Sequence, residues 1–192
     1  MRTTLFLSIL CLLLSFSGKA ENGDLKQLEQ NAIANENPTL FNRIANEYFE
    51  GKELSLAKKN AEKALLFATQ TNNALDLAQA NELLGIIAKK RFDYTNAIEF
   101  LLQALDGWKK LDNPKGIAKV NLHIGQIFHV QKDYTNALIH LNRSQSGFEK
   151  LQDQTALASV HQSLGAVFLA QNFFGKAKES YTTAFDLYIE AE

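Results

Sequence analysis

The chain has 192 residues, of which 46% are hydrophobic and 21% charged, and its 20 basic residues nearly balance its 21 acidic ones. This composition fits one folded domain and excludes an intrinsically disordered chain. The lysine pairs at 58–59, 89–90 and 109–110 are separated by acidic and apolar positions. The sequence therefore predicts neither a face that binds nucleic acid nor a polybasic patch for membranes.

The first twenty residues have the pattern of a secretory signal peptide. Arg2 is followed by an apolar run of 12 residues, 5–16, whereas a membrane-spanning helix needs about 20. Gly18 and Ala20 supply the small side chains of a cleavage site. We expect cleavage after Ala20, a periplasmic or secreted location, and no membrane insertion of the mature chain; an uncleaved N-terminal anchor is the alternative. The single cysteine, Cys11, is lost with this segment, which excludes disulfides and thiolate chemistry in the mature protein.

A leader and four helical hairpins are predicted after the signal peptide. The leader, 21–37, contains one helix from Asp24 to about Asn35. The hairpins follow because apolar and small residues recur at helical spacing, and because residues 93–97 reappear letter for letter at 133–137. The predicted helix pairs are 38–49 with 54–69, 74–91 with 94–111, 114–131 with 134–151, and 154–170 with 174–189. We therefore expect one solenoid domain, 38–192, with repeats at about 38–73, 74–113, 114–153 and 154–192.

The repeated positions share a signature of small residues. A large aliphatic residue precedes a small one in each first helix, an alanine opens each second helix, and a small residue follows seven positions later. These residues are Ile44-Ala45, Leu84-Gly85, Ile124-Gly125 and Leu164-Gly165; Ala57, Ala97, Ala137 and Ala177; and Ala64, Ala104, Ser144 and Ala184. From about Pro38 to Glu192 the pattern resembles the tetratricopeptide repeat.

That resemblance implies an all-α fold, a right-handed α-solenoid of four tandem helix-turn-helix repeats. The forty-residue period is longer than the usual period of about 34 residues. In this respect the chain looks like the long-helix branch seen in kinesin light chains, in peptide-responsive bacterial regulators and in the sensor regions of bacterial signalling proteins.

The glycines at the repeated position indicate close approach of two helices. A glycine inside a helix costs roughly 1 kcal/mol relative to alanine. Gly85, Gly125 and Gly165 occupy one equivalent position, so a neighbouring helix is expected to pass there with no room for a larger side chain. Replacement of Gly125 by leucine should overpack this junction.

The resemblance also implies that the first helix of each hairpin lines a concave surface where a protein or peptide segment binds. The residues expected to face this groove are Asn42, Asn46, Gln79, Glu82, Lys89, Lys119, Gln126, His129 and Gln162, with Leu169 at its far end. Amide and amine side chains can hydrogen-bond a peptide backbone or a carboxylate. A face that is merely solvated is the alternative for each of these residues.

The sequence offers no constellation for catalysis, a cofactor or a metal. The four histidines, His123, His129, His140 and His161, lack an HExxH pair or carboxylates at ligand spacing. Phosphate loops, a nucleophile elbow and dinucleotide fingerprints are absent from the sequence. We therefore expect a non-enzymatic binding scaffold without a cofactor. The alternative is the extracytoplasmic sensor fragment of a transmembrane signalling protein, of the histidine kinase or diguanylate cyclase type, without its output domain.

The last predicted helix carries Tyr181, Phe185, Tyr188 and Ile189, and no polar capping helix follows it. Solenoids usually cover their terminal apolar faces. We therefore expect either a homo-oligomer formed through this C-terminal helix, or last residues that stay partly exposed, or a sequence that is the front part of a longer protein.

Overall fold

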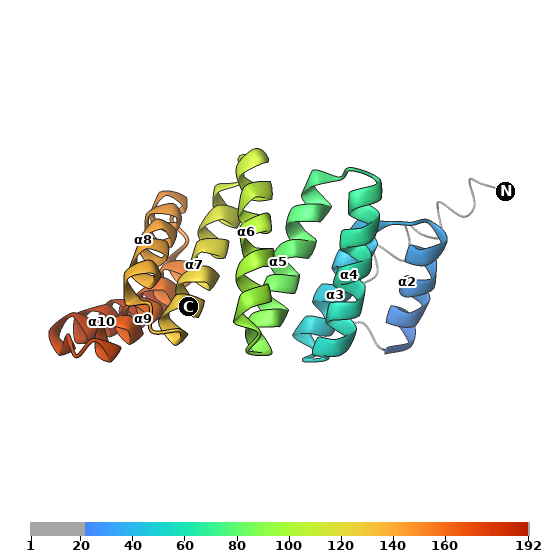
Figure 1. Cartoon of the computed structure of the whole chain (residues 1–192). Helices are drawn as coiled ribbons and strands as arrows, with labels where there is room; N and C mark the ends of the chain where they lie inside the picture. The colour runs from blue at the N-terminus through green and yellow to red at the C-terminus, as the bar shows by residue number, and fades with distance from the viewer. Residues whose placement is uncertain (1–21, 192) are drawn as a thin grey trace.

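A computed structural model of the chain describes residues 22–191, and Figure 1 shows it as a row of helices from α2 at one end to α10 at the other. The predicted signal peptide lies outside the described residues. Within them the elements are α2 (Asn22–Ala34), α3 (Pro38–Glu50), α4 (Leu54–Gln70), α5 (Ala74–Lys90), α6 (Tyr94–Lys110), α7 (Pro114–Val130), α8 (Tyr134–Leu151), α9 (Gln154–Ala170) and α10 (Phe174–Glu190). This part of the chain contains no strand. The prediction of an all-α helical-repeat solenoid is confirmed.

The turns between helices share one geometry. After each helix from α2 to α9 there is a residue in the left-handed region, and an Asn or Asp that caps the next helix usually follows it. At the end of α5, for example, Phe92 has φ 62°, and the side chain of Asp93 accepts a hydrogen bond from the backbone N–H of Asn96. The backbone N–H of Asp93 bonds the carbonyl of Ala88, which satisfies one of the free carbonyls at the helix end. From α4 to α10 each helix begins twenty residues after the one before it.

The helices form two layers. The first helices of successive hairpins, α3, α5, α7 and α9, contact one another in sequence, whereas in the described chain no such contact joins α4, α6, α8 and α10 to each other. Because the helices of one layer contact one another and those of the other layer do not, the stack of hairpins must curve. The inner, concave side therefore belongs to α3, α5, α7 and α9.

Small residues let the two helices of a hairpin approach closely. A Cβ atom placed on Gly125 of α7 would lie 2.8 Å from Leu141 Cγ and 3.2 Å from the carbonyl oxygen of Ala137, both on α8. The same holds at Gly85, which faces Leu101 at 2.6 Å. Both leucines are fully buried. The repeated glycine thus has a steric reason, because the leucine of the partner helix occupies the volume that a side chain would need.

Candidate functional site

A cavity of about 400 Å³ opens on the concave side between α3, α5 and α7. Its walls combine amides and charged groups with an apolar floor. The lining residues are Thr39, Asn42, Arg43 and Asn46 of α3; Gln79, Glu82, Leu83 and Ile86 of α5; Trp108 of α6; and Lys119 of α7. Ligand sites are usually concave, and polar groups placed beside an apolar floor fix the orientation of what binds.

Asp76 joins α3 to α5 at one side of this cavity. Its buried carboxylate accepts hydrogen bonds from Thr39 Oγ1 at 2.7 Å, from Asn42 Nδ2 at 3.0 Å and from Asn73 Nδ2 at 2.7 Å. Asn42 Nδ2 also donates to the backbone carbonyl of Asp76 at 3.1 Å. Because a buried carboxylate needs such donors, Asp76 and Asn42 brace the site and are not free to bind a ligand.

Glu82 is fixed in the same way on the opposite side of α5. Trp108 Nε1 donates to its Oε2 at 2.7 Å, and Lys119 Nζ lies 2.8 Å from its Oε1. The Glu82 side chain is 10% exposed, whereas that of Lys119 is 51% exposed. Both oxygens of the Glu82 carboxylate therefore have partners within the protein, whereas about half of the Lys119 side chain remains exposed to solvent.

A second polar cluster crosses from α5 to α7 and then to α9. Lys89 Nζ donates to Gln126 Oε1 at 2.6 Å and lies 3.0 Å from Nδ1 of His123. Gln126 Nε2 in turn donates to Ser163 Oγ at 3.0 Å. Helices α5, α7 and α9 are thus linked on the concave side by hydrogen bonds whose acceptors are all neutral, and the ammonium group of Lys89 is the one charged donor among them.

The electrostatics of this cluster are unusual because a half-buried lysine lies among neutral groups. Burial, with a smaller contribution from neighbouring Lys90, lowers the pKa of Lys89 to about 8. Burial, followed by the charge of Lys89, lowers the pKa of His123 to about 3. An ammonium can only donate, so Nδ1 of the neutral His123 is the acceptor and its proton lies on Nε2. That Nε2 atom is enclosed and has no hydrogen-bond partner among the described residues.

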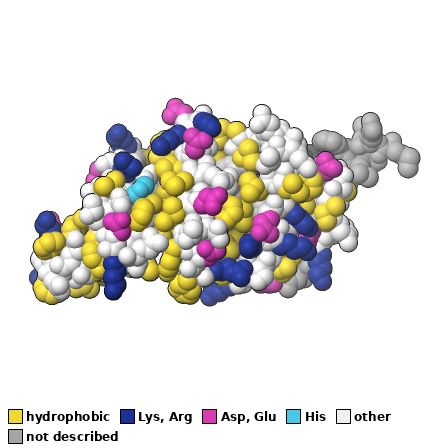
Figure 2. All heavy atoms as spheres, in the orientation of Figure 1, with side chains coloured by type: hydrophobic (Ala, Val, Ile, Leu, Met, Phe, Trp, Pro, Cys, Tyr) yellow, Lys and Arg dark blue, Asp and Glu magenta, His cyan; other side chains and the backbone are white. Residues whose placement is uncertain are grey.

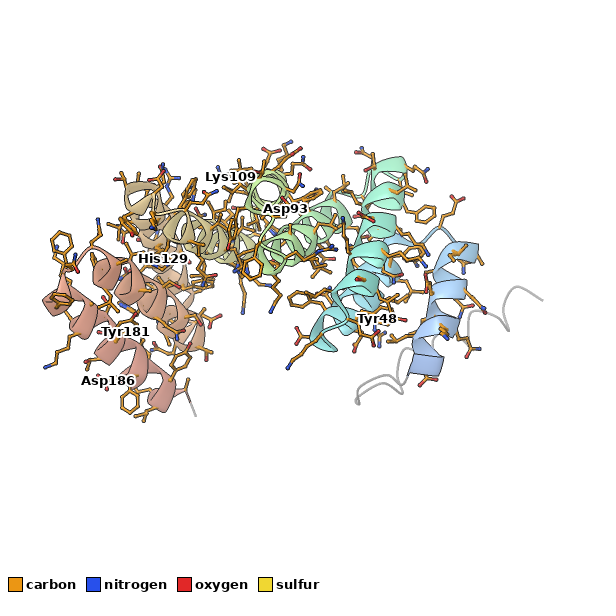
Figure 3. All side chains as sticks on the ribbon, turned by 60° about the horizontal axis from the view of Figure 1, so that its bottom comes forward. Tyr48, Asp93, Lys109, His129, Tyr181 and Asp186 are labelled. Atoms are coloured by element: carbon orange, nitrogen blue, oxygen red, sulfur yellow. The ribbon has the colours of Figure 1, made fainter. Side chains whose placement is uncertain are left out.

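The residues predicted from the sequence divide into three groups. Asn42, Asn46, Gln79, Glu82 and Lys119 line the cavity. Lys89 and Gln126 are bonded to each other at 2.6 Å. His129 and Gln162 lie apart from both. His129, labelled in Figure 3, stands at the end of α7 with its ring 6.3 Å from that of Tyr134, and Gln162 is exposed on α9.

Sequence reasoning missed several residues of the site. Arg43, Leu83 and Ile86 line the cavity, and Asp76 supports it. Asn46, Ile86 and Gln126 follow one another at the forty-residue offset. Because Asn46 and Gln126 were predicted to face the groove, the repeat register could have placed Ile86 there too. Trp108 is buried, and it also forms part of the cavity floor.

A second cavity, of about 310 Å³, lies between α8, α9 and α10. It is lined by Asn142 and Gln145 of α8, His161, Leu164 and Phe168 of α9, and Lys176, Glu179, Ser180 and Thr183 of α10. Unlike the cavity between α3, α5 and α7, it contains none of the residues predicted to face the groove.

Figure 2 shows acidic and basic side chains interspersed on the visible face, with no large field of one sign. Among residues 22–191, no three His, Cys, Asp or Glu side chains are placed to hold a metal ion. None of the helices in this range has both the length and the apolarity to cross a membrane.

The known proteins to which this chain is similar are solved structures, since no protein-family model and no curated protein matches it. BtubC (BKLC) from P. vanneervenii superposes with a TM-score of 0.72 at 19% identity, over 99% of this chain and 74% of its own. Aspartyl phosphate phosphatase F from Bacillus subtilis gives 0.78 at 17% identity, over 88% of this chain and 45% of its own. A Rap protein complexed with Competence and Sporulation Factor gives 0.77 at 18% identity, over 98% of this chain and 52% of its own.

These likenesses show the fold, which is that of tetratricopeptide-like helical repeats. This chain spans about half the length of the last two proteins.

Proposed function

We propose that this protein is a non-enzymatic scaffold that binds a protein or peptide segment along its concave face, and that it acts in the periplasm or outside the cell after removal of residues 1–20. We also assign it to the long-period branch of tetratricopeptide repeats. The observation that carries the proposal is the cavity between α3, α5 and α7, where the exposed amide of Asn46 and the half-buried amide of Gln79 lie beside an apolar floor. Amides can bond the backbone of an extended segment whatever its sequence, and the floor can take a side chain.

Two further facts support a binding role. The polar groups that hold the concave helices together, Asp76, Glu82 and Gln126, already have partners in the protein. The site is therefore preorganised, and binding costs little ordering of its walls. In addition, one structural neighbour was solved as a Rap protein complexed with Competence and Sporulation Factor, so this fold accommodates a bound factor in at least that protein.

The test is a capture experiment with two cavity amides changed together. Asn46 and Gln79 make no side-chain bond to another helix in the described structure. Their double alanine variant should therefore stay folded and lose at least about 1.4 kcal/mol of binding free energy, a tenfold loss of affinity. The immobilised mature protein is exposed to an envelope extract of the source cells, and captured proteins are compared by mass spectrometry.

The matched control replaces two exposed amides of the other layer, Gln70 and Gln103, by alanine. We expect some proteins to be captured by the wild type and by this control but not by the groove variant. Equal capture by all three forms would contradict a role of the concave face.

We also propose that α10 pairs with α10 of a second copy. In the two preceding repeats the equivalent positions are covered by the next helix, so that Trp108 is 5% and Phe148 2% exposed. On α10 the corresponding Tyr188 is 37% exposed, and Phe185 on the same helix is 64% exposed. Covering such an aromatic face removes apolar area from water.

Light scattering coupled to size exclusion is expected to give the mass of a dimer for the mature chain and that of a monomer for Phe185→Glu. Leu102→Glu, which changes an exposed residue of α6, should remain dimeric. A monomeric wild type would rule out the pairing.

A further inference from the structure

We propose that the concave face recognises an acidic segment, with a glutamate or aspartate side chain of that segment bound to Lys89 beside His123. This inference rests on the proposed binding function and names the chemical class of its ligand. The group that carries it is the ammonium of Lys89, which has no carboxylate partner among the described residues.

The hydrogen bonds of Lys89 leave one position open. An ammonium has three N–H donors, and two of them point to Gln126 Oε1 and to Nδ1 of His123. Both acceptors are neutral. Since Lys89 forms no ion pair with any described residue, the third donor is available to a ligand. A charge that is removed from water without a counter-ion is costly, and a carboxylate from the ligand would supply the counter-ion.

The charges around this position have one sign. Lys90 on α5 and Lys119 on α7 both add to the positive potential at His123, together with Lys89 itself. On α9, Ser163 is bonded to Gln126 of this cluster and is neutral. Glu82 is the nearby acid, and it is already bonded to Trp108 and Lys119. The charges that act on this position without a partner in the described chain are therefore positive.

The cations continue along the groove. Arg43 lines the cavity on α3 and forms no ion pair with another described residue. Ile86 of the cavity floor stands one helical turn before Lys89 on α5. A segment lying in the groove can thus place an apolar side chain on the floor and a carboxylate on Lys89. Polar residues extend beyond Lys89 in both directions, toward Asn46 and toward Ser163, so the segment can pass through, and we assign the carboxylate to a side chain and not to a chain terminus.

The protonation of Lys89 gives the interaction a pH dependence with a defined sign. Only the protonated amine attracts a carboxylate. The free protein has a Lys89 pKa of about 8, so above that pH the amine must take up a proton before it can bind. Affinity for an acidic segment is therefore nearly full at pH 7, about halved at pH 8 and lower still above it, whereas an exposed lysine would hold its charge until about pH 10.

The test measures fluorescence anisotropy of two labelled, C-terminally amidated peptides, one of alternating glutamate and alanine and one of alternating glutamine and alanine. At pH 7 and low salt the glutamate peptide is expected to bind about tenfold more tightly. Lys89→Met should abolish most of that difference without changing the glutamine peptide. Lys89→Arg should keep the difference and should show no loss of affinity between pH 7 and 9, because arginine stays charged; the wild type should lose about tenfold over that range.

Lys109→Met is the matched control, because it removes one exposed charge from α6 and should leave both affinities unchanged. Equal binding of the two peptides, failure of both to bind, or full discrimination by Lys89→Met overturns the proposal. Discrimination that appears only when the peptide carries a free C-terminal carboxylate also overturns it, since the ligand would then be a chain terminus. If groove-dependent capture from the extract persists while the glutamate peptide fails, the acidic preference is wrong and the scaffold function stands.

Discussion

Replacing Gly125 by leucine is expected to lower the free energy of unfolding by about 2 to 3 kcal/mol, and the thermal midpoint by about 5 to 10 °C. The first atom of the new side chain already meets Leu141 Cγ at 2.8 Å and the carbonyl oxygen of Ala137 at 3.2 Å. Leu141 is fully buried, so it cannot turn away into solvent. The better helix propensity of leucine offsets only about 0.8 kcal/mol of this overpacking. Thermal and denaturant unfolding followed by circular dichroism measure the loss.

Gly175 provides the control for this substitution. It lies in the first turn of α10, and a Cβ atom added there would meet nothing within 4 Å. Gly175→Ala should therefore be neutral, or raise stability by up to about 1 kcal/mol. If Gly125→Leu unfolded at the same midpoint as the wild type, close packing would not be the reason for the repeated glycine.

Replacing Asp76 by alanine is expected to cost about 2 to 3 kcal/mol of stability. The carboxylate accepts bonds from Thr39, Asn42 and Asn73. Without it, the amide of Asn42, 3% exposed, keeps only its bond to the backbone of residue 76. The link between α3 and α5 across the groove is weakened at the same time. Urea unfolding of the wild type and variant, compared at pH 7, gives the difference.

Asp106→Ala tests whether the loss is specific to the buried position. Asp106 pairs with Lys110 on the surface of α6, where both side chains are more than 60% exposed. Such a pair contributes only about 0.5 kcal/mol or less, so this variant should unfold almost as the wild type does. A similar loss in both aspartate variants would contradict the bracing role of Asp76.

The helices could be predicted because their signals are local and repeated. Proline and the Asn or Asp caps mark where helices begin, and the forty-residue recurrence sets the register. Every predicted helix lies within two residues of an observed one. The repeated glycine was also informative, since it indicated a contact that the geometry at Gly125 explains.

The chemistry of the groove was only partly predictable. Spacing placed Asn42 and Glu82 on the concave side, but it could not tell that Asp76 and Trp108 occupy their polar atoms. Those bonds join residues 34 and 26 positions apart, and they depend on side-chain directions that no periodicity encodes. For the same reason the burial of Lys89 among neutral acceptors could be seen only in three dimensions.

The regular turns constrain how this protein can change its length. The backbone repeats every twenty residues from α4 onward, with a left-handed turn residue at 52, 72, 92, 112, 132, 152 and 172. The side chains repeat only every forty, because alternate helices face the groove. A duplication or deletion of forty residues at any turn would add or remove a complete repeat and leave the neighbouring seams matched. A duplication or deletion of only twenty residues would preserve every turn. It would, however, exchange the inner and outer helices beyond it and direct outer-layer side chains into the groove. Insertions and deletions that keep the side-chain packing are therefore those of two helices, although the backbone geometry alone would accept one helix.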